Sequence, residues 1–232
     1  MILSHKHKFI YIKTYKTAST SIETALSHIL GEQDVITPAS EELQHHRFEA
    51  RQAQNYRLDH PAVPRRPLLK RLLRRPERYY HPSVGYYEHM PAWRVKTYVG
   101  DRVWGDYYKF SFERNPWDRQ VSFFHYKNKN RTTPFSFEKF LERPKNSYVE
   151  NFDLYSIDDE VAMDFVGKYE NLEEDFRKII RTIGLVNDVT LPVTNVSKSV
   201  DAKPYRAFYN DKSRRLIAKW YRREIELFGY EF

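Results

Sequence analysis

The chain has 232 residues and carries 39 Lys and Arg against 31 Asp and Glu, which gives a formal net charge of +8. Its length and its 18 Tyr and 15 Phe exclude a disordered chain and suit one α/β domain with a real core. The absence of cysteine excludes disulfides, thiolate metal sites and a cysteine nucleophile, and no nucleic-acid-binding signature accompanies the positive charge, so we expect no nucleic-acid partner.

The first predicted unit is a strand, a loop and a helix. Residues 8–13, KFIYIK, are aromatic and β-branched and predict a strand. Apolar residues then recur at helical spacing from Ile22 to Leu30, and Gly31 is a suitable stop. The loop between them, KTASTS (16–21), offers a lysine, hydroxyl groups and a helix start, all of which favour an anion. This pattern is typical of a phosphate site, and a Ser/Thr-rich helix cap beside an exposed lysine is the alternative.

The loop differs from the phosphate loops that bind ATP or GTP. It lacks both glycines of the G-x-x-x-x-G-K-[ST] motif, which argues against a kinase or GTPase. Ala18 and Ser19 stand where a glycine would be expected. Either residue would be strained if the turn requires a positive φ.

The next stretch is less regular. Residues 37–67 are polar and predict a loop with short helical pieces. Residues 67–76, PLLKRLLRRP, place leucines on one side and Lys and Arg on the other, which predicts a short basic amphipathic helix. Two interpretations of this helix stay open. It could make a peripheral contact with an anionic surface, or its leucines could pack on the core with the cations solvated.

A second strand–helix unit begins at YYKFSFE, residues 107–113. Asn115 can cap the following helix, and Pro116 suits its first turn. Arg114 stands at the carboxyl end of the strand, where open α/β sheets bind ligands, and a guanidinium is well suited to a terminal phosphate. Ser122 follows about two turns into the helix.

The remaining pattern completes an α/β chain. Residues 163–170 predict a third strand, residues 171–185 a strongly amphipathic helix, and residues 211–228 a final helix. Strands that alternate with helices predict a largely parallel sheet.

These segments resemble the sulfotransferases that use 3′-phosphoadenosine 5′-phosphosulfate (PAPS). YIKTYKTASTSIE resembles their 5′-phosphosulfate loop, although that loop usually has two glycines at the positions of Ala18 and Ser19. FSFERNPWDRQVSFF resembles their 3′-phosphate motif, and YEHMPAWRVKTYV resembles the histidine segment of carbohydrate sulfotransferases of the heparan 2-O type and their bacterial relatives. VGKYENLEEDFRKIIRTIGL and FYNDKSRRLIAKWYRREIELFGYEF resemble later family segments, so the resemblance covers most of the chain outside roughly 37–80.

The resemblance implies a P-loop-like three-layer sandwich, with a central, mostly parallel sheet flanked by helices. Residues 1–232 would form one sulfotransferase domain in which 37–105 includes a variable, acceptor-side insertion. The implied activity moves the sulfuryl group of PAPS to a hydroxyl of a carbohydrate or glycolipid acceptor and needs no metal. The alternatives are a catalytically weak nucleotide-binding protein on the same fold and a P-loop nucleotide kinase. The sequence leaves the acceptor and the oligomeric state open.

The resemblance also implies roles for individual residues. Lys16 would stabilise the leaving phosphate, and His89 would be the general base, with Glu88 as the second candidate. Arg119 matches the motif but is expected only to brace its helix through a salt bridge. Ser197 and Lys198 would belong to a loop that closes over the nucleotide, and an ordinary polar loop is the alternative there. The expected nucleotide-binding residues are Lys16, Thr17, Ala18, Ser19, Thr20, Ser21, Arg114, Ser122, Ser197 and Lys198.

The N-terminal stretch bears on localisation. MILSHKHKFIYIKTYK lacks the uninterrupted apolar run of a signal peptide, and no segment approaches the roughly 20 apolar residues of a membrane span. We therefore expect a cytoplasmic protein without the membrane anchor of Golgi sulfotransferases.

Overall fold

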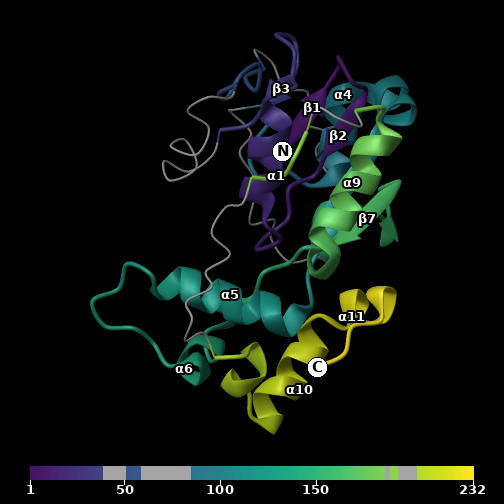
Figure 1. Cartoon of the computed structure of the whole chain (residues 1–232). Helices are drawn as coiled ribbons and strands as arrows, with labels where there is room; N and C mark the ends of the chain where they lie inside the picture. The colour runs from purple at the N-terminus through teal and green to yellow at the C-terminus, as the bar shows by residue number, and fades with distance from the viewer. Residues whose placement is uncertain (39–50, 59–84, 186–188, 193–202) are drawn as a thin grey trace, which may run out of the picture.

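The structure is a computed structural model that describes residues 1–38, 51–58, 85–185, 189–192 and 203–232. Its centre is a five-stranded sheet in the order β3-β1-β2-β4-β7 (Figure 1). Strands β2, β4 and β7 are parallel, while β1 runs antiparallel to both β2 and β3. The five strands are β1 (Ile2–Ser4), β2 (Phe9–Tyr11), β3 (Val35–Ile36), β4 (Tyr108–Glu113) and β7 (Phe165–Lys168). The short strands β5 (Ser156–Ile157) and β6 (Glu160–Val161) form a separate antiparallel pair.

Helices flank this mostly parallel sheet and continue beneath it in the view of Figure 1. The α-helices are α1 (Ser19–Ser27), α4 (Ala92–Asp106), α5 (Pro116–Asn128), α6 (Phe137–Leu141), α7 (Pro144–Ser147), α8 (Phe152–Tyr155), α9 (Leu172–Thr182), α10 (Asp211–Trp220) and α11 (Arg222–Phe228). Two short 3-10 helices, η1 (Tyr169–Asn171) and η2 (Tyr205–Phe208), complete the described elements. No helix in the described ranges is long and apolar enough to span a membrane.

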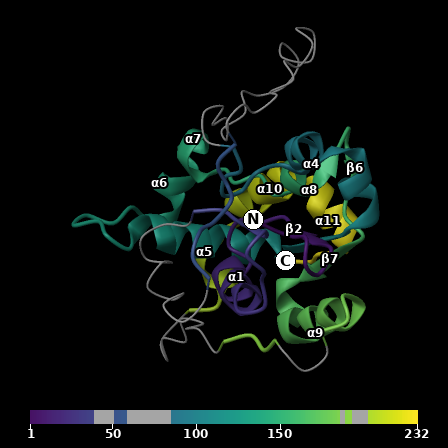
Figure 2. The ribbon, with the colours of Figure 1, turned by 90° about the horizontal axis from the view of Figure 1, so that it is seen from above.

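Strand β2 is apolar on both faces, and helices cover both sides of the sheet. Successive strand residues point to opposite faces. Phe9 and Tyr11 of β2 join a hydrophobic cluster with α1 and α9, whereas Ile10 joins a second cluster with α4 and α8. Figure 2 shows α1 and α9 on one side of the sheet and α4 and α8 on the other. Because β2 is buried on both faces, its position in the sheet is fixed, and so is the point at which the following loop begins.

A third, aromatic cluster lies below the sheet in Figure 1, where α5, α6, α10 and α11 meet. Trp117 and Phe124 of α5 pack there with Phe137 of α6 and Ile217 of α10. Asn115 caps α5 as predicted, because its side chain accepts a hydrogen bond from the Trp117 N–H at 3.1 Å. This cluster holds α5 against the rest of the protein and so positions the residues that follow β4.

The structure confirms the three strands predicted around 8–13, 107–113 and 163–170 and the helices that follow them. The prediction of one helix over 211–228 is wrong, because Tyr221 interrupts it with φ −117° and ψ 32°. The Tyr221 hydroxyl is buried between the Val149 N–H and the Gln120 side chain, which fixes the break.

Other parts of the fold were not predicted or cannot be compared with a prediction. Strands β1 and β3 and helix α4 were not predicted. Part of the predicted loop 37–67 and all of the predicted basic helix 67–76 lie outside the described residues.

Candidate functional site

The loops that follow β2 and β4 meet at one edge of the sheet. The two strands are parallel and pair Tyr11 with Phe110, so their carboxyl ends lie side by side. Beyond the strand pairing, the Thr14 hydroxyl donates to the Phe112 carbonyl at 2.5 Å. At the edge itself, Nη1 of Arg114 donates to the carbonyl of Lys16 at 3.1 Å. The two predicted phosphate-binding segments therefore meet at this edge of the sheet.

The loop after β2 turns through two left-handed residues. Lys16 has φ 60° and Ala18 has φ 57°, and Ala18 is the N-cap of α1 without a side-chain capping bond. The strain anticipated for the missing glycines falls on these residues and not on Ser19, which begins α1. Each left-handed non-glycine residue costs about 1 kcal/mol. The turn nevertheless aims the start of α1 at the sheet edge, where the first-turn N–H groups and the helix dipole favour an anion.

The hydroxyl groups of this loop differ in their surroundings. The Thr17 side chain is completely buried, and its hydroxyl lies 2.9 Å from the Thr14 hydroxyl, so it holds the loop together. Any contact of Thr17 with a ligand is thus left to its backbone. Ser19 and Ser21 are buried and Thr20 is partly buried along the first turn of α1. Because these hydroxyl side chains are not exposed, the first turn of α1 offers its backbone N–H groups, rather than a row of hydroxyls, to a ligand.

The Lys16 side chain reaches towards α5. Its ammonium lies 4.7 Å from the centre of the Tyr126 ring, a cation–π distance. Tyr126 is half exposed. The structure therefore places the positive charge of Lys16 between the β2 loop and the surface of α5.

Arg114 is held by several partners at once. Its Nε and Nη2 donate to Asp118 at 2.9 and 2.8 Å, and its guanidinium carbon lies 4.0 Å from the centre of the Tyr169 ring. Ser122 lies one turn beyond Asp118 on the same face of α5. An anion at Arg114 and Ser122 would therefore share this face with the Asp118 carboxylate, which the sequence analysis did not anticipate.

Arg119 holds its helix in place through salt bridges, as expected. It is buried and bonds to Glu113 at 2.5 Å and to Glu224 at 3.0 Å, so α5 is tied to β4 and α11. Glu113 also accepts a bond from the Asn151 amide at 3.1 Å. These bonds make Arg119 structural, in agreement with its exclusion from the predicted ligand-binding set.

The side chain of Asn151 holds the β2 loop through two hydrogen bonds to its backbone. Its Oδ1 accepts from the Tyr15 N–H at 2.8 Å, and its Nδ2 donates to the Tyr15 carbonyl at 3.2 Å. The residue is fully buried immediately before α8, 136 residues along the chain from Tyr15. No local pattern marks such a contact, and for this reason sequence reasoning missed it.

His89 is anchored to the same loop. Its Nδ1 lies 3.1 Å from the Lys13 carbonyl, and its ring stacks on Tyr15 with centroids 3.7 Å apart. A carbonyl can only accept, so Nδ1 carries the hydrogen and Nε2 keeps a free lone pair in the neutral ring. Burial, followed by the charge of Lys13, lowers the pKa of His89 well below its usual value. The ring is therefore neutral near pH 7, and Nε2 can accept a proton.

Glu88 and Lys13 belong to a buried charge cluster behind His89. Lys13 is only 2 % exposed, and its ammonium forms ion pairs with Glu88 and, at 2.7 Å, with Glu23. The other oxygen of Glu23 accepts from the amino group of Met1 at 2.7 Å. Glu88 Oε1 lies 3.9 Å from Nε2 of His89. In the sequence, Lys13 is the last residue of a predicted strand, and nothing near it in the chain indicates this cluster.

Two of the predicted site residues cannot be placed. Ser197 and Lys198 lie outside the described residues. Within the described ranges, no group of three or more His, Cys, Asp or Glu side chains is arranged to hold a metal ion.

Comparison with known proteins connects this geometry to a family. A family model with the description "Sulfotransferase family" matches residues 1–231. The chain is also similar to an uncharacterized protein of Archaeoglobus fulgidus, with 35 % identity over 112 residues that cover 47 % of this chain and 93 % of the relative. The family match includes the β2 loop, Arg114 and His89, so all three belong to the matched region.

Proposed function

The chain belongs to the sulfotransferase family, and we propose that it moves the sulfuryl group of PAPS to a hydroxyl of a carbohydrate or glycolipid acceptor. One observation carries the proposal: Arg114 touches the Lys16 carbonyl. Because of this contact, both cationic residues belong to one sheet edge, which supports a site with one cation for each phosphorylated end of the nucleotide. In the proposal, residues 1–232 form a single domain with the P-loop-like three-layer arrangement.

The Lys16 loop and the start of α1 would hold the 5′-phosphosulfate, because they combine an ammonium with a helix N-terminus. Arg114 and Ser122 would hold the 3′-phosphate, which distinguishes PAPS from ATP. PAPS supplies the sulfuryl group. The residues of this chain supply binding, orientation and a proton acceptor.

His89 is the proposed base. The acceptor hydroxyl gives its proton to Nε2 of His89 while its oxygen bonds to sulfur. The bond from sulfur to the bridging oxygen breaks, and its electron pair stays on the 5′-phosphate, where Lys16 stabilises the charge. Glu88 is less suited to the role, because Lys13 already holds its carboxylate in an ion pair. The products are the sulfated acceptor and adenosine 3′,5′-bisphosphate.

The acceptor class rests on the resemblance of the segment around His89 to carbohydrate sulfotransferases. Tyr87, Met90 and Val95 of this segment, residues 87–99, belong to the hydrophobic cluster on the face of the sheet covered by α4. Residues 37–105 are the proposed acceptor side. This part of the proposal is independent of how the nucleotide binds and needs its own assay.

Calorimetric titration tests the nucleotide site. We expect adenosine 3′,5′-bisphosphate to bind wild type about 10-fold or more tightly than ADP. Arg114→Ala should abolish the difference, while Arg181→Ala, which removes an exposed cation on α9, should preserve it. Equal binding of the two nucleotides to wild type would contradict the proposal and favour a nucleotide kinase.

A transfer assay with PAPS and a panel of saccharides tests the chemistry, with His89→Asn as the informative variant. Asparagine tolerates the φ of 56° and can still donate to the Lys13 carbonyl, but it lacks the second ring nitrogen. We expect transfer to slow by about 100-fold or more, with bisphosphate binding unchanged. Bisphosphate binding without any transfer by wild type would favour the nucleotide-binding alternative.

A further inference from the structure

The amide side chain of Asn151 joins the β2 loop to the end of β4. Its two bonds to the backbone of Tyr15 use the oxygen and one hydrogen of the amide. The second hydrogen goes to Oε1 of Glu113, the last residue of β4, at 3.1 Å. Both Asn151 and Glu113 are fully buried. The β2 loop is therefore tied to a part of the protein that is fixed in the core.

The peptide group that Asn151 holds is the one that leads into Lys16. Because a peptide group is planar, the bond to the Tyr15 carbonyl at 3.2 Å orients the whole group between Tyr15 and Lys16. The next peptide group is held by Arg114, which donates to the Lys16 carbonyl at 3.1 Å. Two oriented peptide groups fix both backbone angles of the residue between them. That residue is Lys16, and its φ is 60°.

Lys16 needs such restraint because it is not glycine. Glycine adopts a left-handed conformation without strain, whereas other residues keep it only where the surrounding structure imposes it. Arg114 belongs to the proposed 3′-phosphate site, so a bound nucleotide competes for the guanidinium that holds the Lys16 carbonyl. Asn151 is buried, and its bonds to Tyr15 are available with or without a nucleotide.

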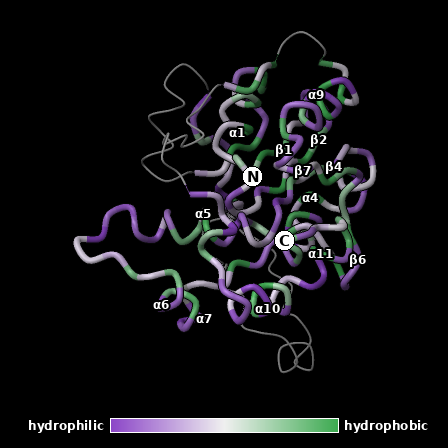
Figure 3. Tube along the Cα trace, turned by 60° about the horizontal axis from the view of Figure 1, so that its bottom comes forward, coloured by the Kyte–Doolittle hydropathy of each residue, from purple (hydrophilic) through white to green (hydrophobic). Residues whose placement is uncertain are grey.

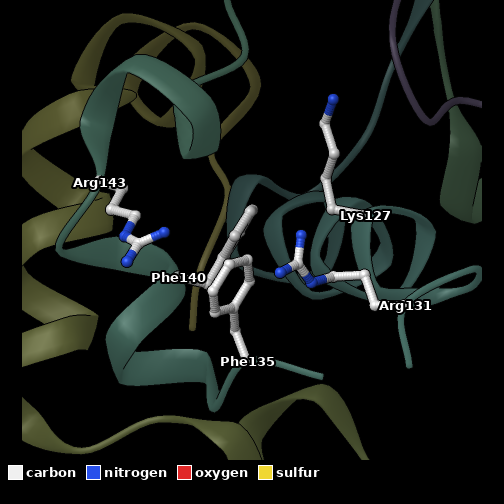
Figure 4. A pocket seen from close by; sticks show the side chains of 5 residues that line it. All are labelled: Lys127, Arg131, Phe135, Phe140 and Arg143. Carbon is white, nitrogen blue, oxygen red and sulfur yellow. The ribbon is translucent and has the colours of Figure 1, made fainter. Parts of the chain in front are cut away.

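The contact between the Lys16 side chain and α5 restrains the backbone only weakly. The ammonium lies over the ring of Tyr126, which is half exposed, and cation–π contacts at exposed rings are weak. Figure 4 shows the side chains that line a cavity of about 250 Å³ next to Tyr126: Lys127, Arg131, Phe135, Phe140 and Arg143. Three of them are cations, which repel the Lys16 ammonium, and the chain from α5 to α6 beside them is largely hydrophilic in Figure 3. The left-handed conformation is therefore held mainly through the backbone bonds.

We propose that Asn151 is a positioning residue that compensates for the absence of glycine from the β2 loop. It imposes the left-handed conformation at Lys16 and so keeps the loop in the shape that binds the 5′-phosphate end of the nucleotide. The inference rests on the proposed function, because it takes this loop to be a nucleotide site. Asn151 itself touches no part of the nucleotide. Without Asn151 the loop relaxes, and the nucleotide has to restore the strained conformation at the expense of its own binding energy.

Calorimetric titration of the full chain with adenosine 3′,5′-bisphosphate provides the first test. Asn151→Ala should weaken binding by about 5-fold or more, because the cost of a left-handed residue then falls on the binding step. Tyr155→Phe is the matched control. Tyr155 is also buried and donates to Glu113 at 3.1 Å, through the carboxylate oxygen that Asn151 does not use. This variant should bind the bisphosphate within about 2-fold of wild type.

The pair Lys16→Ala and Lys16→Gly separates positioning from a general loss of stability. Both variants lack the ammonium, so a difference between them reports on the backbone alone. With Asn151 present the conformation is imposed, so the two should bind the bisphosphate equally, and Lys16→Gly should melt roughly 2–4 °C higher. In the Asn151→Ala background, Lys16→Gly should bind about 5-fold more tightly than Lys16→Ala. If Asn151→Ala does not fold, the pair in the otherwise wild-type chain still decides, because equal melting with unequal binding contradicts the inference.

Three results would overturn the inference. They are an unchanged bisphosphate affinity in Asn151→Ala, an equally large loss in Tyr155→Phe, and tighter binding by Lys16→Gly than by Lys16→Ala while Asn151 is present. Any of these alongside normal binding by wild type rejects the role of Asn151 alone. A wild type that binds no bisphosphate rejects the proposed function instead, and the melting difference within the Lys16 pair still reports whether the loop is held.

Discussion

Replacing Lys13 with Met would test the buried charge cluster behind His89. The ammonium of Lys13 serves two carboxylates, Glu23 at 2.7 Å and Glu88. Methionine has a similar length and no charge, so the change removes the interaction without leaving a large cavity. It also leaves Glu23, which is 1 % exposed, with Met1 as its remaining ion-pair partner among the described residues.

Removing one partner of a buried ion pair costs roughly 3–5 kcal/mol, because a buried charge loses its compensation. Glu88 is 30 % exposed and Glu23 keeps its bond to the amino group of Met1. We therefore expect a loss near the lower end, about 3 kcal/mol in the free energy of unfolding. Urea denaturation measures it. Lys13→Met combined with Glu88→Gln should recover part of the loss, since Glu23 keeps its ion pair with Met1 and the carboxylate of Glu88 is gone.

The same variant should change the pH dependence of transfer. The charges that face His89 are those of Lys13, Met1, Glu23 and Glu88. Removing the positive charge of Lys13 raises the pKa of His89, so the acidic limb of the kcat/KM profile should move to higher pH. Unchanged stability together with an unmoved acidic limb would refute the role that we assign to this cluster.

Three further changes have defined outcomes. Ala18→Gly should raise the free energy of unfolding by about 1 kcal/mol in urea titrations, because glycine adopts φ 57° without strain. Asp118→Asn should tighten bisphosphate binding several-fold in calorimetry, because the amide keeps an acceptor for Arg114 but removes the competing charge. Burial raises the pKa of Glu150 to about 8, so the folded protein holds a proton that the unfolded chain releases above pH 4.5. Glu150 should therefore contribute a loss of stability as the pH rises from 5 to 8, by up to about 1.4 kcal/mol per unit, and Glu150→Gln should remove this contribution from melting curves.

The parts of the site that could be predicted are those governed by local pattern. The strand–loop–helix unit around Lys16, the position of Arg114 at a strand end and the capping role of Asn115 all follow from residues close together in sequence. The strain at Ala18 was also foreseeable, because a phosphate loop without glycine must place another residue at positive φ.

The parts that could not be predicted depend on contacts between distant segments. Lys13 meets Glu88 across 75 residues, and Asn151 meets Tyr15 across 136. A lysine at the end of an apolar strand has the same local pattern whether it is exposed or buried between carboxylates. The break at Tyr221 has a similar cause, since its hydroxyl bonds to residues far outside its own helix.

The short segment from Lys13 to Lys16 connects the two sides of the proposed site. The Lys13 carbonyl accepts a hydrogen bond from the ring of His89, and the Tyr15 ring stacks on that ring. The carbonyl of Lys16 accepts a hydrogen bond from Arg114. Asn151 restrains both backbone groups of Tyr15, which lies in the middle of this segment. A nucleotide that draws Arg114 away from Lys16 therefore also acts on the peptide that orients His89. The nucleotide side and the acceptor side of the proposed site therefore influence each other, and we expect the binding of either ligand to change the affinity for the other.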